Sequence, residues 1–137
     1  MATPLSIRLN DDALQRLFFR AQVAGLPPRT YAQQLIEEGM RIAEHPSVRF
    51  TSGPSGRRAT LAGSGLDVSE VISMLRASGN DQAETAATLS ISTALVEASI
   101  AYYGAYAGEI DERIELNRLE GERGRAEYLA GMERLVG

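Results

Sequence analysis

Arginine carries most of the chemistry that this chain can offer. The 137 residues contain fourteen basic side chains, all of them arginine, with one histidine and no cysteine. Schiff-base, P-loop lysine and thiolate chemistry are therefore excluded. His45 lies before Pro46, outside any metal-ligand spacing, and is interpreted as a solvated linker residue. We expect no enzyme activity, no metal site and no cofactor.

Composition places this chemistry on a globular protein of one ordinary domain or two small ones. The net charge of −4 does not favour nucleic acid over the whole surface, so a DNA contact must come from local arginine clusters. No apolar run approaches the roughly 18 residues of a membrane span. No basic-then-apolar signal pattern opens the chain. We expect a cytoplasmic protein without membrane contact.

Polar and apolar residues alternate near the start of the chain. Ser6 and Arg8 lie between Leu5, Ile7 and Leu9. Strict alternation predicts a half-buried strand with its polar residues on one face. A lone strand leaves both backbone edges unpaired, and no second strand follows closely. The sequence therefore predicts that this strand pairs with the same strand of a second copy.

Two helices are expected to follow the strand. Asn10 suits the cap of the first helix, and Gly25 suits its end. Pro28 or Arg29 can open the second helix, which ends before His45. About forty residues cannot bury a core alone, so their apolar stripes also require dimerisation. The stripes comprise Leu14, Leu17, Phe18, Ala21 and, in the second helix, Tyr31, Leu35, Ile36, Met40 and Ile42.

Residues 3–44 resemble the ribbon-helix-helix family of DNA-binding proteins, which includes the Arc, MetJ and CopG repressors. The alternating strand, the Asn10 cap, the Gly25-Leu26 turn and the helix from Pro28 carry the resemblance. It implies an intertwined dimer whose paired strands enter the major groove of operator DNA. The chain departs from the family at Pro27, where many members have a Ser or Thr cap. Proline has no backbone N–H, so one contact of the expected phosphate site is missing. A ribbon-helix-helix used only for dimerisation is the alternative.

This resemblance assigns DNA contacts to particular residues. Ser6 and Arg8 fall at the base-reading positions, with Pro4 at the margin. Arginine can donate two hydrogen bonds to a guanine edge, and serine adapts to several edges. Arg29 and Thr30 fall at the N-terminus of the second helix, where the family anchors phosphate.

Residues 46–117 read as a second domain. Residues 49–58 are rich in turn formers and predict a linker or hairpin, and short strand signals run from residue 60 to residue 68, broken by two glycines. Three helical patterns follow: residues 69–77, a segment capped by Asp81, and a segment starting at Ser92. The last two, joined by a tight turn, have the outline of a helix-turn-helix.

A second resemblance is carried by residues 49–50, 53–59, 61–63, 66–68, 101–103 and 109–111. Through these segments, residues 48–117 resemble the domain-of-unknown-function family numbered 433. The family is described as winged-helix-like and occurs in bacterial antitoxins, often beside genes for PIN-domain ribonucleases of the VapC kind.

Cations in the second domain are unevenly placed. The helix from Ser92 contains no arginine, which is unusual for a DNA-reading helix, so a packing or protein-binding role is favoured. Arg57 and Arg58, with Arg49 nearby, form the better electrostatic site for DNA, and solvated loop charges are the equal alternative. The tyrosines of the third helix are interpreted as core or interface residues: Tyr102, Tyr103 and Tyr106.

The last residues predict a marginal amphipathic segment. A thin apolar stripe from Ile110 is expected to be interrupted at Gly121 and Gly124, and a short helix follows. Its apolar residues are Tyr128, Leu129, Met132, Leu135 and Val136.

Resemblance to VapB-type antitoxins implies that this segment wraps a toxin, and some members of that group push an arginine among the toxin's metal-binding carboxylates. Arg123, Arg125 and Arg134 are equal candidates for that arginine. A helix packed on its own dimer mate is the alternative.

Together these observations predict a mainly α protein. Residues 1–45 form a ribbon-helix-helix domain, residues 46–117 a small winged-helix or helix-turn-helix-like domain, and residues 118–137 a helical tail. The leading hypothesis is a type II antitoxin that binds a PIN-domain ribonuclease and represses its own operon as a homodimer or higher even oligomer on double-stranded operator DNA. The rivals are a stand-alone ribbon-helix-helix repressor without a toxin and a purely structural interaction module.

Overall fold

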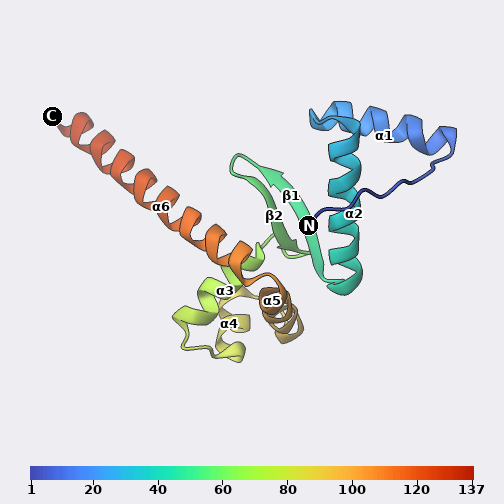
Figure 1. The fold of residues 1–137 in the computed structure, drawn as a ribbon. Coiled ribbons are helices and arrows are strands. Elements are labelled where there is room, and N and C mark those ends of the chain that lie inside the picture. Colours follow the sequence, from blue (N-terminus) through green and yellow to red (C-terminus); the bar gives the residue numbers. More distant parts are fainter. The chain divides into compact units, whose positions relative to one another are not determined.

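The computed structural model describes residues 1–137 and divides into two compact units, Met1–Ala43 and Glu44–Gly137 (Figure 1). It contains six helices and one antiparallel hairpin of two strands, which confirms the mainly helical prediction. None of the six helices combines the length and apolar character needed to cross a membrane.

The first unit is built from α1 (Asp11–Ala24) and α2 (Pro28–Glu44). The side chain of Asn10 accepts a hydrogen bond from the Ala13 N–H at 2.8 Å, which satisfies one of the unpaired donors at the start of α1. Gly25 ends α1 in the left-handed conformation, with φ of 70°, where a side chain is disfavoured. The predicted cap, the predicted stop and the opening of α2 at Pro28 are confirmed.

The segment before α1 forms no strand in the single chain. Residues 1–10 are exposed and have no regular secondary structure. A strand needs a neighbour for its backbone groups, and a single chain has none to offer here. The ribbon made from two chains therefore stays a prediction.

The second unit opens with a hairpin of β1 (Val48–Gly53) and β2 (Gly56–Leu61), so the predicted linker or hairpin is a hairpin. Val48 pairs with Leu61 at the base, and Gly53 pairs with Gly56 at the turn. The strand signals beyond residue 61 do not extend β2. They form a turn, closed by a single bridge between Thr60 and Asp67.

Three helices follow: α3 (Val68–Ala77), α4 (Gln82–Leu89) and α5 (Thr93–Ala105). Asp81 accepts a hydrogen bond from the Glu84 N–H at 2.9 Å, and Ser92 accepts one from the Leu95 N–H at 3.2 Å. Both caps are where the sequence places them. The turn of residues 90–92 joins α4 to α5, at the place where the sequence predicts a tight turn.

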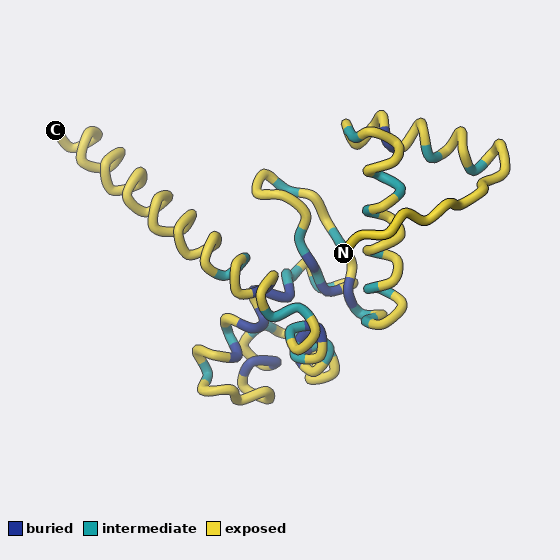
Figure 2. Tube along the Cα trace, viewed as in Figure 1, coloured by how far each residue is buried: buried dark blue, intermediate teal, exposed yellow.

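A continuous core holds the second unit together (Figure 2). It draws side chains from the hairpin, α3, α4, α5 and α6 (Ala107–Val136). Tyr102 is completely buried, and Tyr103 and Tyr106 pack against the core, which confirms the tyrosines as core residues. The buried members are Val48, Ala59, Leu61, Val68, Val71, Ile72, Leu75, Ala86, Val96, Tyr102 and Ile110.

The C-terminal prediction was wrong in one respect. α6 is one continuous helix of 30 residues, without a break at Gly121 or Gly124 and without a separate short helix after them. A glycine inside a helix costs roughly 1 kcal/mol relative to alanine but does not by itself end the helix. Residues 118–137 are therefore the distal part of α6.

Candidate nucleic-acid and protein interfaces

The N-terminal arm carries the residues assigned to base recognition. Pro4, Ser6 and Arg8 are exposed on it, and Arg8 has no ion-pair partner within the chain. The apolar residues that alternate with them are exposed as well, and Leu5 is 78% exposed. In the single chain neither face of the arm is covered.

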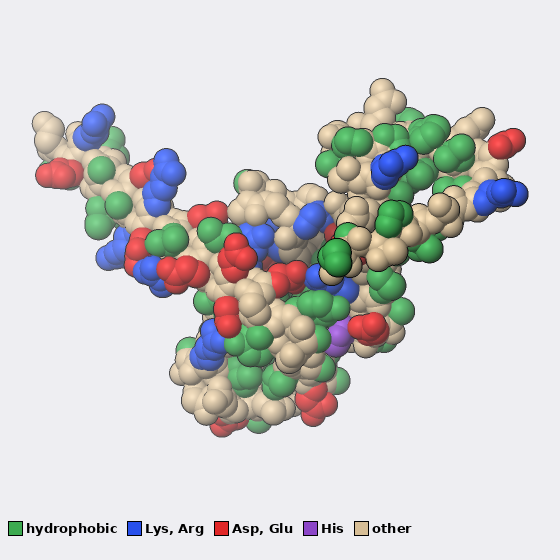
Figure 3. Space-filling model, in the orientation of Figure 1, with side chains coloured by type: hydrophobic (Ala, Val, Ile, Leu, Met, Phe, Trp, Pro, Cys, Tyr) green, Lys and Arg blue, Asp and Glu red, His purple; other side chains and the backbone are tan.

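The apolar faces of α1 and α2 are also uncovered. Ala21 is the only buried residue of the first unit. Figure 3 shows hydrophobic side chains over the visible surface of these helices. Burying such side chains stabilises a fold by about 25 cal/mol per Å² of apolar surface, so the first unit lacks most of its own driving force. The exposed large side chains of the two helices are Leu14, Phe18, Phe19, Val23, Leu35, Ile36 and Met40.

The N-terminus of α2 presents the residues assigned to phosphate. Arg29 and Thr30 are exposed there. The Tyr31 N–H donates to the Pro27 carbonyl at 3.0 Å, and Pro28 has no N–H. The backbone N–H groups of Arg29 and Thr30 therefore have no acceptor in the chain and form part of the positive end of the helix dipole.

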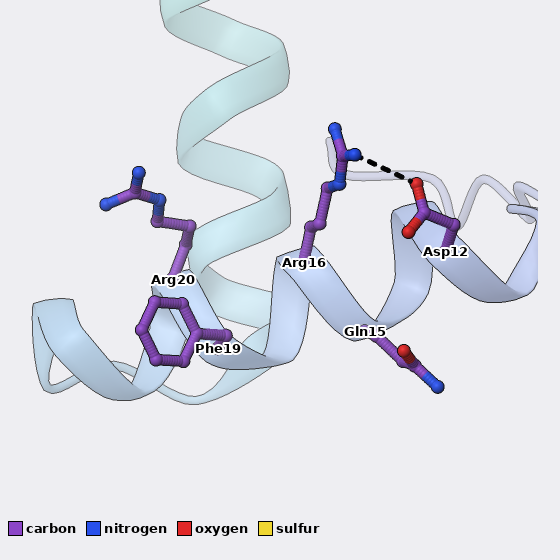
Figure 4. A pocket seen from close by; sticks show the side chains of 5 residues that line it. All are labelled: Asp12, Gln15, Arg16, Phe19 and Arg20. Carbon is purple, nitrogen blue, oxygen red and sulfur yellow. Dashed lines mark ion pairs between the residues drawn. The ribbon is translucent and has the colours of Figure 1, made fainter.

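Two further arginines lie on α1, outside the set of residues predicted from the sequence to contact DNA. Figure 4 shows an open hollow whose lining comes entirely from this helix. Arg16 pairs with Asp12 at 3.2 Å, one turn away, whereas Arg20 has no such partner. Their i, i+4 spacing was the available signal. The hollow is an open helix surface rather than an enclosed site, and its lining is Asp12, Gln15, Arg16, Phe19 and Arg20.

The hairpin arginines are separated by their strand. Arg57 and Arg58 are consecutive in β2, so their side chains leave opposite faces. Arg57 donates to the Ser52 hydroxyl at 3.0 Å. Arg58 forms an ion pair with Asp67 at 3.0 Å, at the residue that caps α3. Arg58 therefore braces the hairpin against α3, and the two arginines do not form one cluster.

Arg49 also serves the fold of the second unit. Its guanidinium donates to the carbonyls of Pro46 and Val48, each at 2.8 Å. Arg113 of α6 donates to the carbonyls of Ser55 and Arg57 at the hairpin turn, at 3.1 and 3.2 Å. The turn of the hairpin and the start of α6 are thus tied together.

A polar network fixes the proximal part of α6. Arg76 of α3 donates to Asp111 at 2.8 Å and to the Tyr103 hydroxyl at 2.6 Å, and Tyr103 donates to Asp111 at 2.9 Å. The hydrogen bond from Arg76, and then the one from Tyr103, lower the pKa of Asp111 below its usual value. Three helices of the second unit, α3, α5 and α6, therefore meet at one carboxylate.

The distal part of α6 has no covering element. Residues 115–137 are all exposed, including Tyr128 at 63% and Leu135 at 83%. The three arginines predicted to bind a partner differ here. Arg123 donates to Glu127 at 3.0 Å, whereas Arg125 and Arg134 have no partner within the chain. By helical spacing Arg125 lies beside Tyr128 and Leu129, and Arg134 lies on another face.

No protein-family model, curated protein or solved structure matches the chain. The two family resemblances rest on the residues quoted for them.

Proposed function

We propose that the chain is a type II antitoxin that binds operator DNA as a ribbon-helix-helix homodimer, represses its own operon and holds a PIN-type ribonuclease toxin through its second unit. The winged-helix-like second domain then serves protein contacts. The stand-alone repressor without a toxin is the second candidate, since the DNA end of the proposal does not depend on a toxin.

The apolar surface of the first unit carries the DNA end of the proposal. The arm has Leu5, Ile7 and Leu9 on one side, and the two helices have uncovered apolar faces, so the first unit of a single chain has no core. A second copy, with its arm paired antiparallel to the first, covers these faces and satisfies the backbone of both arms. Ser6 and Arg8 then face outward from a two-stranded ribbon, which fits the major groove.

The distribution of charge also supports DNA binding by the first unit and protein contacts by the second. Residues 1–43 hold five arginines and four acidic residues, whereas residues 44–137 hold nine arginines and fourteen acidic residues. Phosphate neutralisation dominates affinity for DNA, so the first unit is the better candidate for DNA. The acidic second unit suits protein contacts instead.

Among the tail arginines, the structure favours one for contact with a toxin. Arg123 is engaged by Glu127, and Arg134 lies away from Tyr128 and Leu129. Arg125 is unpaired and lies beside these apolar residues, which would enter the interface with it. An arginine desolvated among apolar contacts gains most from meeting carboxylates.

A gel shift with the DNA upstream of the gene tests the DNA end. Arg8→Ala should weaken binding by roughly 5- to 150-fold, the range of a base contact of about 1–3 kcal/mol. Arg134→Ala removes the same charge from the end of α6 and should leave binding within about twofold. Undiminished binding by Arg8→Ala removes the arm from the DNA site.

Co-expression with the adjacent gene product separates the two candidates. An antitoxin should co-purify with a PIN-like protein and suppress its ribonuclease activity, and Arg125→Ala should release that activity while Arg123→Ala should not. If no PIN-like reading frame adjoins the gene, the stand-alone repressor is the better description.

A further inference from the structure

Four residues of distal α6 form a stripe in which bulky side chains alternate with glycines. Gly124, Tyr128, Gly131 and Leu135 are spaced by four, three and four residues, which places them on one helix face. All four are exposed, and a Cβ built at either glycine meets no atom within 4 Å. We call these four residues the distal stripe.

The distal stripe continues the face by which α6 packs in its own unit. At the proximal end Ile110 is buried in the core, Ile114 packs against it, and Asn117 donates to the Ser69 hydroxyl at 3.5 Å. The next residues at the same 3–4 spacing are Gly121 and Gly124. One face is therefore covered by α3 and α5 over its first turns and by nothing afterwards.

The uncovered part is a poor helix on its own. Three glycines occur in residues 118–137 before the last residue, and each costs roughly 1 kcal/mol in a helix interior. Pairing of Arg118 with Glu115 and Glu122, and of Arg123 with Glu127, returns only about 0.2–0.5 kcal/mol per pair. Packing against another element supplies most helical stability in proteins, and no element of the chain packs against this part of α6.

We propose that the distal stripe pairs with the distal stripe of a second copy of this chain, the two α6 helices running antiparallel. In the register that sets Tyr128 opposite Gly131 of the second copy, Leu135 falls opposite Gly124 of the second copy. Each bulky side chain then meets a glycine, and the two backbones approach closely. Two-fold symmetry repeats both contacts, so four layers are filled.

Charge in the flanking positions selects the same register. Residues that flank the stripe on the same side of the seam meet two positions out of step with the central layers. Glu127 therefore lies beside Arg134 of the second copy, and symmetry gives the reciprocal pair. On the other side of the seam, Arg125 lies beside Met132 of the second copy, and the aliphatic stem of the arginine packs on the thioether. No like charges meet across this register.

A parallel pairing fits less well. Two parallel helices in register set Tyr128 against Tyr128, Leu135 against Leu135 and each glycine against a glycine. The bulky layers then hold the helices apart, and the glycine layers become voids, which cost stability. The alternation of large and small residues therefore favours the antiparallel arrangement.

This pairing goes beyond the proposed function and needs neither DNA nor a toxin. It occupies the residues assigned to the toxin, so a toxin that used them would displace the second copy. The two proposals fail separately, since the experiment below uses the chain alone.

The absence of cysteine allows a direct test by cross-linking. Full-length Gly124→Cys and Leu135→Cys chains, carrying tags of different size, are co-expressed and treated with a short bismaleimide. The antiparallel register predicts a cross-link between the two different chains and none between like chains, because like positions lie roughly 16 Å apart along the axis at 1.5 Å per residue. Cross-links between like chains, or no cross-link at all, overturn the proposal.

A matched pair of glycine variants tests the register. Gly131→Leu, added to both cysteine chains, fills the space opposite Tyr128 and should lower the yield of the mixed cross-link at least tenfold. Gly121→Leu adds the same side chain on the same face but outside the paired region, and should leave the yield within twofold. Circular dichroism of both variants checks that α6 remains helical. Equal yields from the two variants contradict the register.

Discussion

The two units differ in how much apolar surface each covers by itself. The second unit buries eleven hydrophobic residues in one cluster that joins the hairpin to four helices. The first unit has two well-formed helices and buries only Ala21. Correct caps and helix periodicity are present in both, so the difference lies in packing. The comparison shows that local signals specify helices, while a core requires enough elements to enclose it.

A similar contrast occurs inside the second unit. The first turns of α6 are fixed by the buried Ile110 and by the network around Asp111, whereas the rest of the helix is exposed. Figure 3 shows acidic and basic side chains along α6 beside hydrophobic ones. Exposed apolar side chains therefore gather in the two regions that the chain does not cover.

The largest effect is expected where the first unit lacks a core. Leu35→Asp places a charge on the apolar face of α2 and should abolish pairing through the first unit together with the ordered structure of α1 and α2, leaving the second unit and any pairing through α6 intact. Gln34→Asp, on the polar face of the same helix, should leave the dimer intact. Sedimentation and hydrogen exchange of both variants measure this. A folded monomeric first unit in Leu35→Asp contradicts the argument.

A smaller effect is expected in the second unit. Tyr102→Ala empties the centre of its core and should lower the free energy of unfolding by about 3–5 kcal/mol, the range for a large buried aromatic. Leu119→Ala truncates an exposed side chain of α6 outside the distal stripe and should cost less than about 0.5 kcal/mol. Denaturant unfolding of the second unit gives both values, and equal losses count against the division between core and surface.

Helix caps compare the units one residue at a time. Asn10→Ala and Asp81→Ala each remove a side-chain acceptor from a helix start and should each cost about 1 kcal/mol. The loss in Asn10→Ala should depend on protein concentration, because we expect the first unit to fold only as a dimer. The loss in Asp81→Ala should not. Thermal melts over a hundredfold range of concentration distinguish the two cases.

The smallest effect is a dependence on pH confined to the second unit. The pKa of Asp111 is lowered by hydrogen bonds from Arg76 and Tyr103. Its contribution is therefore present above the usual carboxyl value of 3.8 and is lost as the pH falls through the lower value of the folded state. Acid titration of Asp111→Asn should lack this loss. A titration identical to that of the unmodified chain excludes the contribution of Asp111.

Much of the local structure could be predicted from single residues. Asn10, Gly25, Asp81 and Ser92 mark helix ends in the sequence, and all four act at helix ends in the structure. The predicted interruption at Gly121 and Gly124 was wrong, because a glycine can end a helix or lie inside one, and composition does not say which. The separation of Arg57 from Arg58 follows from strand geometry, but only once β2 is known to be a strand.

The sequence by itself determined the order of the helices, their caps and the alternation in the arm, because these depend on neighbours within a few residues. Only the tertiary structure decided that residues 49–58 form a hairpin, that Tyr102 belongs to the core rather than to an interface, that Arg58 pairs with Asp67, and that α6 runs uncovered to residue 136. The first contacts join residues far apart in the chain, and the exposure of α6 depends on whether another element packs against it. They follow from how the elements pack, which periodicity does not encode.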